Sequence, residues 1–248
     1  MKISHMARWL LFSRYAPMRL YSLSYYVRLL CAGTPFTFSR FGDGEWAAIL
    51  GEVGENCDGH PFSVELKAAL AGTLLNPLDY FHAMQPRAVR IDGKRIGAYL
   101  RRNGIAVPWH CANVFHDANL RGKINPLIKE LRKRPVVMVG PAHLRPLNKT
   151  AFAYVDFVEV PAQNCFEHTA DTIMRVREAA AADPAGRIYA FSASMAANVM
   201  IHRLYPDLGA KNWLIDFGSL WDVYVGVESR SVYRKLDWRP LIAENLRP

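Results

Sequence analysis

The sequence lacks several features that would assign it to a special class of protein. It has only four cysteines, and no two lie close enough for a CxxC zinc or redox motif; they are Cys31, Cys57, Cys111 and Cys165. No apolar run approaches the roughly 20 residues that a membrane-spanning helix needs. The 16 glycines and 15 prolines among 248 residues are ordinary numbers, which excludes collagenous and low-complexity chains. These absences indicate a reduced, cytoplasmic, globular protein.

Acidic residues are scarce in the first part of the chain. Residues 1–150 contain 21 Lys/Arg and 10 Asp/Glu, a net charge of +11, whereas residues 151–248 contain 10 and 12, a net charge of −2. A basic region of this kind favours an acidic partner, namely nucleotide phosphates, a nucleic acid or an anionic membrane surface. The alternative is a solvated basic face with no partner.

Residues 1–34 form a basic and aromatic segment that we expect to be helical. Its apolar residues can line one side of a helix beside arginines; they are Trp9, Leu10, Phe12, Tyr21, Tyr25, Tyr26 and Leu29. Pro17 should divide the helix into two pieces. We expect the stripe to pack on its own domain, and the alternative is peripheral contact of residues 1–30 with the inner membrane face.

The remaining residues, 35–248, alternate short apolar segments with amphipathic ones. Strands are predicted at 35–41, 135–140, 157–162, 187–193 and 212–218, and helices at 45–51, 63–76, 92–103, 124–134, 168–182 and 195–204. Ser63 is a candidate N-cap for the second of these helices. The alternation predicts an α/β fold, a single Rossmann-like domain with a mostly parallel sheet and helices on both faces.

Polar or small residues follow every predicted strand, and ligands of open α/β sheets bind beyond the carboxyl ends of the strands. The most specific of these segments is 40–45, with the sequence RFGDGE. Its glycines permit a tight turn, Asp43 and Glu45 can both reach one divalent cation, and Arg40 can face phosphate. The alternative is a surface turn in which Glu45 only opens the next helix.

Four segments resemble, in order, blocks of the GT-D-fold glycosyltransferases, formerly a domain of unknown function. They are FSRFGDGEWAAILG (38–51), VEVPAQNCFEHTADTI (158–173), SASMAANVMIHRL (192–204) and LIDFGSLWDVY (214–224). The chain departs from the family pattern in three places. Ser194-Met195 replaces a Gly-Pro pair, Ser219 replaces a histidine, and Asp222 is displaced by one position from an acidic pair.

The resemblance implies a metal-dependent glycosyltransferase of the hexosyltransferase type that uses a nucleotide-sugar donor, with a UDP-sugar as our first choice. Asp43 and Glu45 would hold Mn²⁺ or Mg²⁺ with the donor diphosphate, and Arg40 would support the phosphates. The other predicted donor contacts are Gly42, Gly44, Gly140, His143, Asn164, Ser194 and Gly218. Asp222 is the predicted base that removes the acceptor proton, and Asp216 is the alternative.

Several alternatives stay open at this point. A glycan or lipid-linked saccharide is the preferred acceptor over a modified DNA base, since no nucleic-acid motif is present. A non-catalytic nucleic-acid- or nucleotide-binding protein is the second hypothesis, and a nucleotide-sugar hydrolase is the third. We interpret His110, Cys111 and His116 as loop residues rather than zinc ligands.

Overall fold

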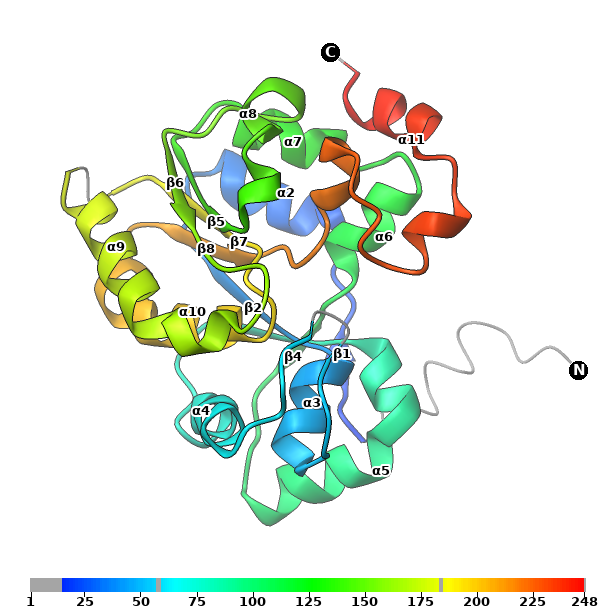
Figure 1. Cartoon of the computed structure of the whole chain (residues 1–248), viewed down its shortest axis with the longest axis vertical. Coiled ribbons are helices and arrows are strands. Elements are labelled where there is room, and N and C mark those ends of the chain that lie inside the picture. Colours follow the sequence, from blue (N-terminus) through cyan, green and yellow to red (C-terminus); the bar gives the residue numbers. More distant parts are fainter. Residues whose placement is uncertain (1–14, 57–58, 183–184, 248) are drawn as a thin grey trace, which may run out of the picture.

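One eight-stranded sheet forms the centre of the molecule in the computed structural model, which describes residues 15–56, 59–182 and 185–247 (Figure 1). The strand order is β1-β4-β3-β2-β8-β7-β5-β6, and every neighbouring pair is parallel. The strands are β1 (Met18–Arg19), β2 (Thr37–Phe41), β3 (Phe81–Met84), β4 (Trp109–Cys111), β5 (Val136–Gly140), β6 (Asp156–Glu159), β7 (Ile188–Phe191) and β8 (Trp213–Asp216). The predicted α/β fold with a parallel sheet is confirmed.

Helices cover both faces of the sheet, also as predicted. One face carries α2 (Leu23–Cys31), α6 (Val114–Leu120), α7 (Asn125–Leu131), α8 (Leu147–Thr150) and α11 (Trp238–Asn245). The other carries α3 (Asp43–Leu50), α4 (Val64–Leu75), α5 (Pro86–Arg102), α9 (Thr169–Ala182) and α10 (Ala196–Leu208). Short 3₁₀ turns complete the chain: η1 (Ala142–Leu144), η2 (Cys165–His168), η3 (Asp222–Val225) and η4 (Tyr233–Lys235).

The central strands β5 and β7 are apolar throughout because both of their faces are covered. On β5, Val136 and Met138 join the core beneath α2 and α7, whereas Val137 and Val139 join the core beneath α9 and α10. Successive side chains of a strand point to opposite faces, so a strand between two helical layers reads as one continuous apolar run.

Local sequence signals explain where several helices begin and end. The Ser63 hydroxyl accepts a hydrogen bond from the amide of Leu66 at 3.1 Å, which confirms the predicted N-cap of α4. Gly51 ends α3 in a left-handed conformation with φ of 78°. The prediction of a helix at 92–103 was wrong at its first residue, because α5 begins at Pro86 and is only kinked at Asp92.

Three strands of the sheet were missed by the sequence analysis, namely β1, β3 and β4. They have two to four residues each, and β3 and β4 carry buried histidines, His82 and His110, within the strand. Polar side chains inside such short segments hide the apolar run that identifies a buried strand.

Helix α2 belongs to the core of the domain. Tyr26 and Leu30 are fully buried beside Phe38 of β2, and Pro17 directly precedes β1. Trp9, Leu10 and Phe12, which the sequence analysis assigned to the same apolar stripe, lie outside the described residues. Among the helices of the described part, none combines the length and the apolar character needed to cross a membrane.

The chain leaves neighbouring strands toward opposite faces, and this opens crevices at the carboxyl edge of the sheet. It passes from β2 into α3 on one face and from β8 toward η3 on the other. The same alternation holds for β7, followed by α10, and β5, followed by η1 and α8. Ligands bind at such points in open α/β sheets, so we expect the ligand-binding site at this edge.

Candidate functional site

The adjoining ends of β2 and β8 bring an arginine and an aspartate together. Nη1 of Arg40 lies 3.9 Å from Oδ1 of Asp216, with the side chains 15% and 5% exposed. The amide of Gly218 donates to the same carboxylate oxygen at 2.8 Å. Gly218 has φ of +54°, and a Cβ there would lie 2.0 Å from Nη1 of Arg40. Glycine at this position therefore lets the guanidinium lie against the backbone.

Glu45 adds a second carboxyl group to this junction from the first turn of α3. Its Oε2 accepts a hydrogen bond from the amide of Gly42 at 2.8 Å, which caps the first turn of α3. Burial and, to a smaller extent, the charge of Asp216 raise the pKa of Glu45 to about 7 against the lowering effect of its backbone hydrogen bonds and of Arg40. Glu45 thus caps α3 and also faces the buried charges of β2 and β8.

Asp43 lies at the rim of the same junction. Its Oδ2 is 2.8 Å from Nε of Arg87 in an exposed ion pair, and its amide donates to Oε1 of Gln85 at 3.2 Å. An exposed ion pair contributes little free energy, so the carboxylate can exchange Arg87 for another cation.

The carboxylates of Asp43 and Glu45 are of the chemical type that binds a divalent cation together with phosphate oxygens. Asp43 and Glu45 supply the oxygen donors that Mg²⁺ and Mn²⁺ prefer, and a cation beside Glu45 would favour its charged form. Within the described part of the chain, no three His, Cys, Asp or Glu side chains could hold a metal ion by themselves. Phosphate and water oxygens would therefore complete the coordination shell, as is usual for metal–nucleotide complexes.

Around these strand ends lie several buried polar atoms that have no hydrogen-bond partner among the described residues. They include Nε of Arg40, Oγ of Ser192 after β7, and Oδ1 of Asn198 on α10. Nδ2 of Asn198 donates to the carbonyl oxygen of Arg40 at 2.6 Å and to Oγ of Ser39 at 3.2 Å. Buried polar groups in native proteins are nearly always hydrogen-bonded, so this group of atoms points to a polar ligand.

The turn between β7 and α10 closes over the start of α3. Ser194 has φ of +50°, a left-handed conformation that favours glycine, and its Oγ accepts a hydrogen bond from Nδ2 of Asn56 at 3.0 Å. A Cβ on Gly44 would lie 3.4 Å from Cβ of Asn56 and 3.5 Å from Sδ of Met195. The serine therefore keeps the backbone geometry that glycine would adopt without strain.

His143 and Asp222 form a second polar pair, at the end of β5. Nε2 of His143 lies 3.0 Å from Oδ1 of Asp222, and Oγ of Ser229 donates to Oδ2. Gly140 directly precedes this turn, and a Cβ there would lie 3.4 Å from Cβ of Ser192. Asp222 is 5% exposed and has both carboxylate oxygens engaged.

A third polar cluster, missed by the sequence analysis, lies between these two. The hydroxyl of Tyr233 is 3.1 Å from the carbonyl oxygen of Ser219, and Nε of Arg230 donates to Oγ of Ser219 at 3.1 Å. Tyr233 also bonds to His116 at 3.2 Å. Burial, together with the charges of Arg40 and Arg230, lowers the pKa of His116 to about 3. Nothing in the sequence brings 116, 219 and 233 together before the fold does.

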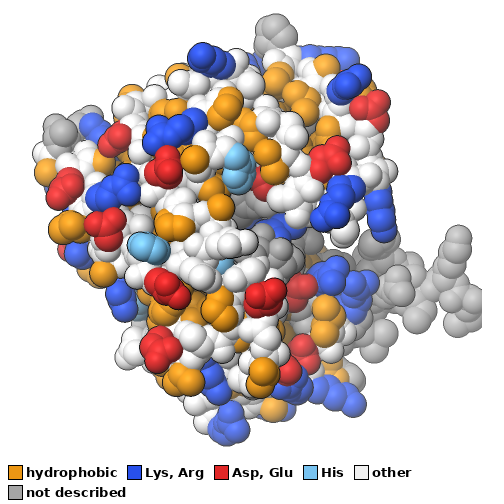
Figure 2. All heavy atoms as spheres, in the orientation of Figure 1, with side chains coloured by type: hydrophobic (Ala, Val, Ile, Leu, Met, Phe, Trp, Pro, Cys, Tyr) orange, Lys and Arg blue, Asp and Glu red, His pale blue; other side chains and the backbone are white. Residues whose placement is uncertain are grey.

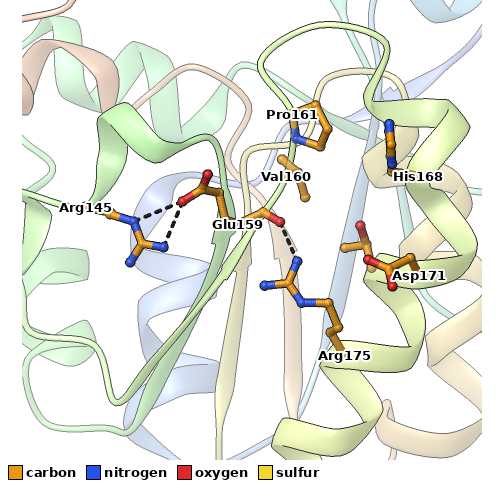
Figure 3. A pocket seen from close by; sticks show the side chains of 8 residues that line it. Arg145, Glu159, Val160, Pro161, His168, Asp171 and Arg175 are labelled. Carbon is orange, nitrogen blue, oxygen red and sulfur yellow. Dashed lines mark hydrogen bonds and ion pairs between the residues drawn. The ribbon is translucent and has the colours of Figure 1, made fainter.

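Asn164 follows β6, the strand at one edge of the sheet, and has φ of +52°. An open pocket of about 440 Å³ lies at the end of the same strand (Figure 3). Nε and Nη2 of Arg145 donate to Oε2 of Glu159, and Nη1 of Arg175 donates to the carbonyl oxygen of Glu159 at 2.9 Å. His168 and Asp171 line the same pocket from η2 and α9 (Figure 3). Polar groups of both charges thus surround this pocket, and Asn164 is not one of its lining residues.

No family model matches this sequence, and no curated protein matches it. Solved structures do. One, described as domain of unknown function 1792 with a distinct glycosyltransferase fold, is 14% identical, covers 86% of this chain and 82% of its own, and has a TM-score of 0.61. Another, described as a new glycosyltransferase of this domain from Streptococcus sanguinis, is 16% identical, covers 82% of each chain and has a TM-score of 0.62. The chain has this glycosyltransferase fold.

Within the glycosyltransferase fold, the predicted residues gather at one edge of the sheet in separate groups. Arg40, Glu45, Asp216 and Gly218 lie together, with Gly42, Asp43, Gly44 and Ser194 around them. His143 and Asp222 form a pair beyond Gly140, and Asn164 stands apart from both groups. Their individual roles stay predictions.

Proposed function

We propose that this chain is a glycosyltransferase that transfers a hexosyl group from a nucleotide sugar to a hydroxyl acceptor. A UDP-sugar is our first choice of donor. The observation that carries this proposal is the meeting of Arg40, Glu45 and Asp216 beside unpartnered buried polar atoms, in a glycosyltransferase fold. A cationic group and carboxylates at one buried strand junction suit a metal–diphosphate complex.

Each group has a role in this proposal. Arg40 binds the diphosphate and stabilises the negative charge that develops on it as it leaves. Asp43 and Glu45 hold the divalent metal, which when bound supplies further positive charge to the diphosphate. The start of α10 faces the donor with backbone amides. Asn164 and the neighbouring pocket receive the nucleoside.

For the acceptor we prefer a glycan or a lipid-linked saccharide. The outer face of α5 is strongly basic, with exposed Arg87, Arg90, Lys94, Arg95, Arg101 and Arg102 and one acidic residue, Asp92. Lys and Arg side chains gather over this region in Figure 2, at the lower edge of the view. This face suits an acceptor that carries negative charge or lies at an anionic surface.

The test of this function is release of nucleoside diphosphate from a panel of nucleotide sugars, with Mn²⁺, Mg²⁺ or a chelator. We expect metal-dependent release from one donor, and a loss of at least about 100-fold in Asp43→Asn. Asp92→Asn is the matched control, since it also removes a carboxylate paired with an arginine of α5. Full metal-dependent turnover in Asp43→Asn would contradict the assignment of this residue.

The second candidate function is non-catalytic binding of a nucleic acid, which the basic face of α5 favours. It predicts no turnover of any donor, no thermal stabilisation by donors, and binding that weakens steeply as salt rises. In that case, substitution of Arg90 and Lys94 would weaken binding, and Asp43→Asn would not.

A further inference from the structure

The geometry points to His143 as the general base of the transfer, with Asp222 as the residue that positions it. This inference rests on the proposed function. It exchanges the two roles predicted from the sequence, where Asp222 was the base and His143 a donor contact.

The environment of Asp222 disfavours direct proton transfer to its carboxylate. The residue is 5% exposed, and its two oxygens are already bonded to His143 and Ser229. An acceptor hydroxyl therefore has little access to this buried carboxylate. A carboxylate held in this way is suited to orienting an imidazole and stabilising its positive charge.

His143 has the complementary properties. Its side chain is 35% exposed, whereas that of Asp222 is 7% exposed. A carboxylate accepts hydrogen bonds, so Nε2 of His143 carries the proton that points to Oδ1, and this assignment leaves the lone pair on Nδ1. Among the described residues, Nδ1 has no hydrogen-bond partner, so a basic nitrogen is available to an incoming hydroxyl.

The pair also lies close to the proposed donor site. η1, which carries His143, follows β5, while η3, which carries Asp222, follows β8 just beyond Asp216 and Gly218. Ser229, which donates to Asp222, adjoins Arg230, and Nε of Arg230 donates to Oγ of Ser219 at 3.1 Å. Ser219 directly follows Gly218, so a chain of contacts links the pair to the end of β8 at the proposed donor site.

The step balances as a single displacement. The acceptor oxygen forms a bond to the anomeric carbon while its proton passes to Nδ1 of His143. The bond from the anomeric carbon to the diphosphate oxygen breaks, and its electron pair leaves with the diphosphate, where Arg40 stabilises the charge. The imidazolium is stabilised by Asp222 and then returns its proton to water.

The test compares the wild-type protein with His143→Ala, Asp222→Asn and the double variant. Diphosphate release is measured from the active donor, with water or p-nitrophenyl glycosides as acceptor. We expect His143→Ala to lower kcat by about 10²- to 10⁴-fold with unchanged donor affinity, and added imidazole to restore part of the rate. The control is His202→Ala, which removes a half-buried histidine of α10. We expect this variant to keep the wild-type kcat, and added imidazole to leave that kcat unchanged.

The double variant tests whether Asp222 acts through His143. A positioning role predicts that the double variant is no slower than His143→Ala, whereas independent roles predict that the two losses multiply. Ser229→Ala, which removes the other partner of Asp222, serves if Asp222→Asn does not fold. We expect it to lower kcat in wild type but not in the His143→Ala background.

The outcomes separate this inference from the function on which it rests. If the wild-type protein releases diphosphate from no donor, both the base assignment and the proposed function are overturned. Wild-type turnover that survives in His143→Ala, or that falls only through weaker donor binding, overturns the base assignment and leaves the glycosyltransferase standing. Loss of kcat without any rescue by imidazole also overturns it.

Discussion

The two polar junctions at the carboxyl edge of the sheet are built in opposite ways. At the ends of β2 and β8, Arg40 and Asp216 are 3.9 Å apart, Nε of Arg40 has no hydrogen-bond partner among the described residues, and the pKa of Glu45 is raised by burial. Where η1 meets η3, both oxygens of Asp222 are bonded and Nε2 of His143 lies 3.0 Å from Oδ1 of Asp222. The buried charged groups of the first junction are incompletely paired, whereas the buried carboxylate of the second is hydrogen-bonded at both oxygens.

This difference indicates a division of labour. Burying charged groups without full pairing costs free energy, which a bound diphosphate and cation would recover. A carboxylate bonded at both oxygens instead fixes the histidine in a reactive orientation before any ligand arrives. The first junction should therefore respond to substitution through binding, and the second through the rate of the chemical step.

The largest effect is expected from Gly218→Ala, which breaks the first junction. The new Cβ would lie 2.0 Å from Nη1 of Arg40, so the guanidinium must leave its position beside Asp216. We expect kcat/KM for the donor to fall by about 1,000-fold, together with the thermal stabilisation that the donor gives.

Gly33→Ala is the control for backbone strain in that experiment. Gly33 has φ of +69°, and an added Cβ would meet nothing within 4 Å, so this position shares the unfavourable conformation without the clash. Each alanine should cost about 1 kcal/mol in free energy of unfolding. Equal turnover of the two variants would show that the function of Arg40 does not depend on a glycine at position 218.

Glu45→Gln should have the next largest effect and act on binding of the metal–donor complex. Glutamine keeps an oxygen that can accept a hydrogen bond from the Gly42 amide, so this capping bond survives while the negative charge is lost. We expect about 100-fold lower kcat/KM, a higher metal concentration at half-maximal rate, and an unchanged unfolding temperature. Glu65→Gln, at an exposed acid in the first turn of α4, should change none of these. If Glu45→Gln instead loses activity because it unfolds, Glu45 serves only to cap α3.

The sequence predicted the fold better than it predicted the grouping of the site. Apolar periodicity located β2, β5, β6, β7 and β8, because buried parallel strands and amphipathic helices differ in period. The RFGDGE segment located the start of α3, because glycines and acids at a strand-to-helix turn have few other uses. Short strands with internal histidines escaped the same criteria.

The arrangement of side chains around the site was beyond the sequence for a physical reason. Asn198, Arg230 and Tyr233 acquire their roles from contacts across 11 to 159 residues of chain. Such contacts depend on the strand order, which no local pattern encodes. The engagement of Asp222 by Ser229 likewise follows from the η3 turn and not from the residue type.

The smallest effect is expected for a buried histidine of the core, His82, whose protonation changes stability and not turnover. This test distinguishes buried titratable groups that act on stability from those at the site. His82 of β3 stacks on Tyr80 with ring centroids 4.2 Å apart, and burial lowers its pKa to about 4. In the unfolded chain the pKa returns to about 6.5, so between these values the unfolded state binds more protons. Stability is therefore lost as the pH falls from about 6.5 toward 4, by about 2 kcal/mol from this group between pH 7.5 and 5.

Urea unfolding of wild type and His82→Phe at both pH values measures this contribution. Phenylalanine keeps a ring that can stack on Tyr80 but has no proton to bind, so we expect a flatter pH dependence of stability with unchanged turnover. Parallel pH dependences in the two proteins would mean that His82 is not buried as a neutral group. A variant that is flatter but also slower would place this buried histidine with the groups that serve the site, since a purely structural titration leaves the chemical step alone.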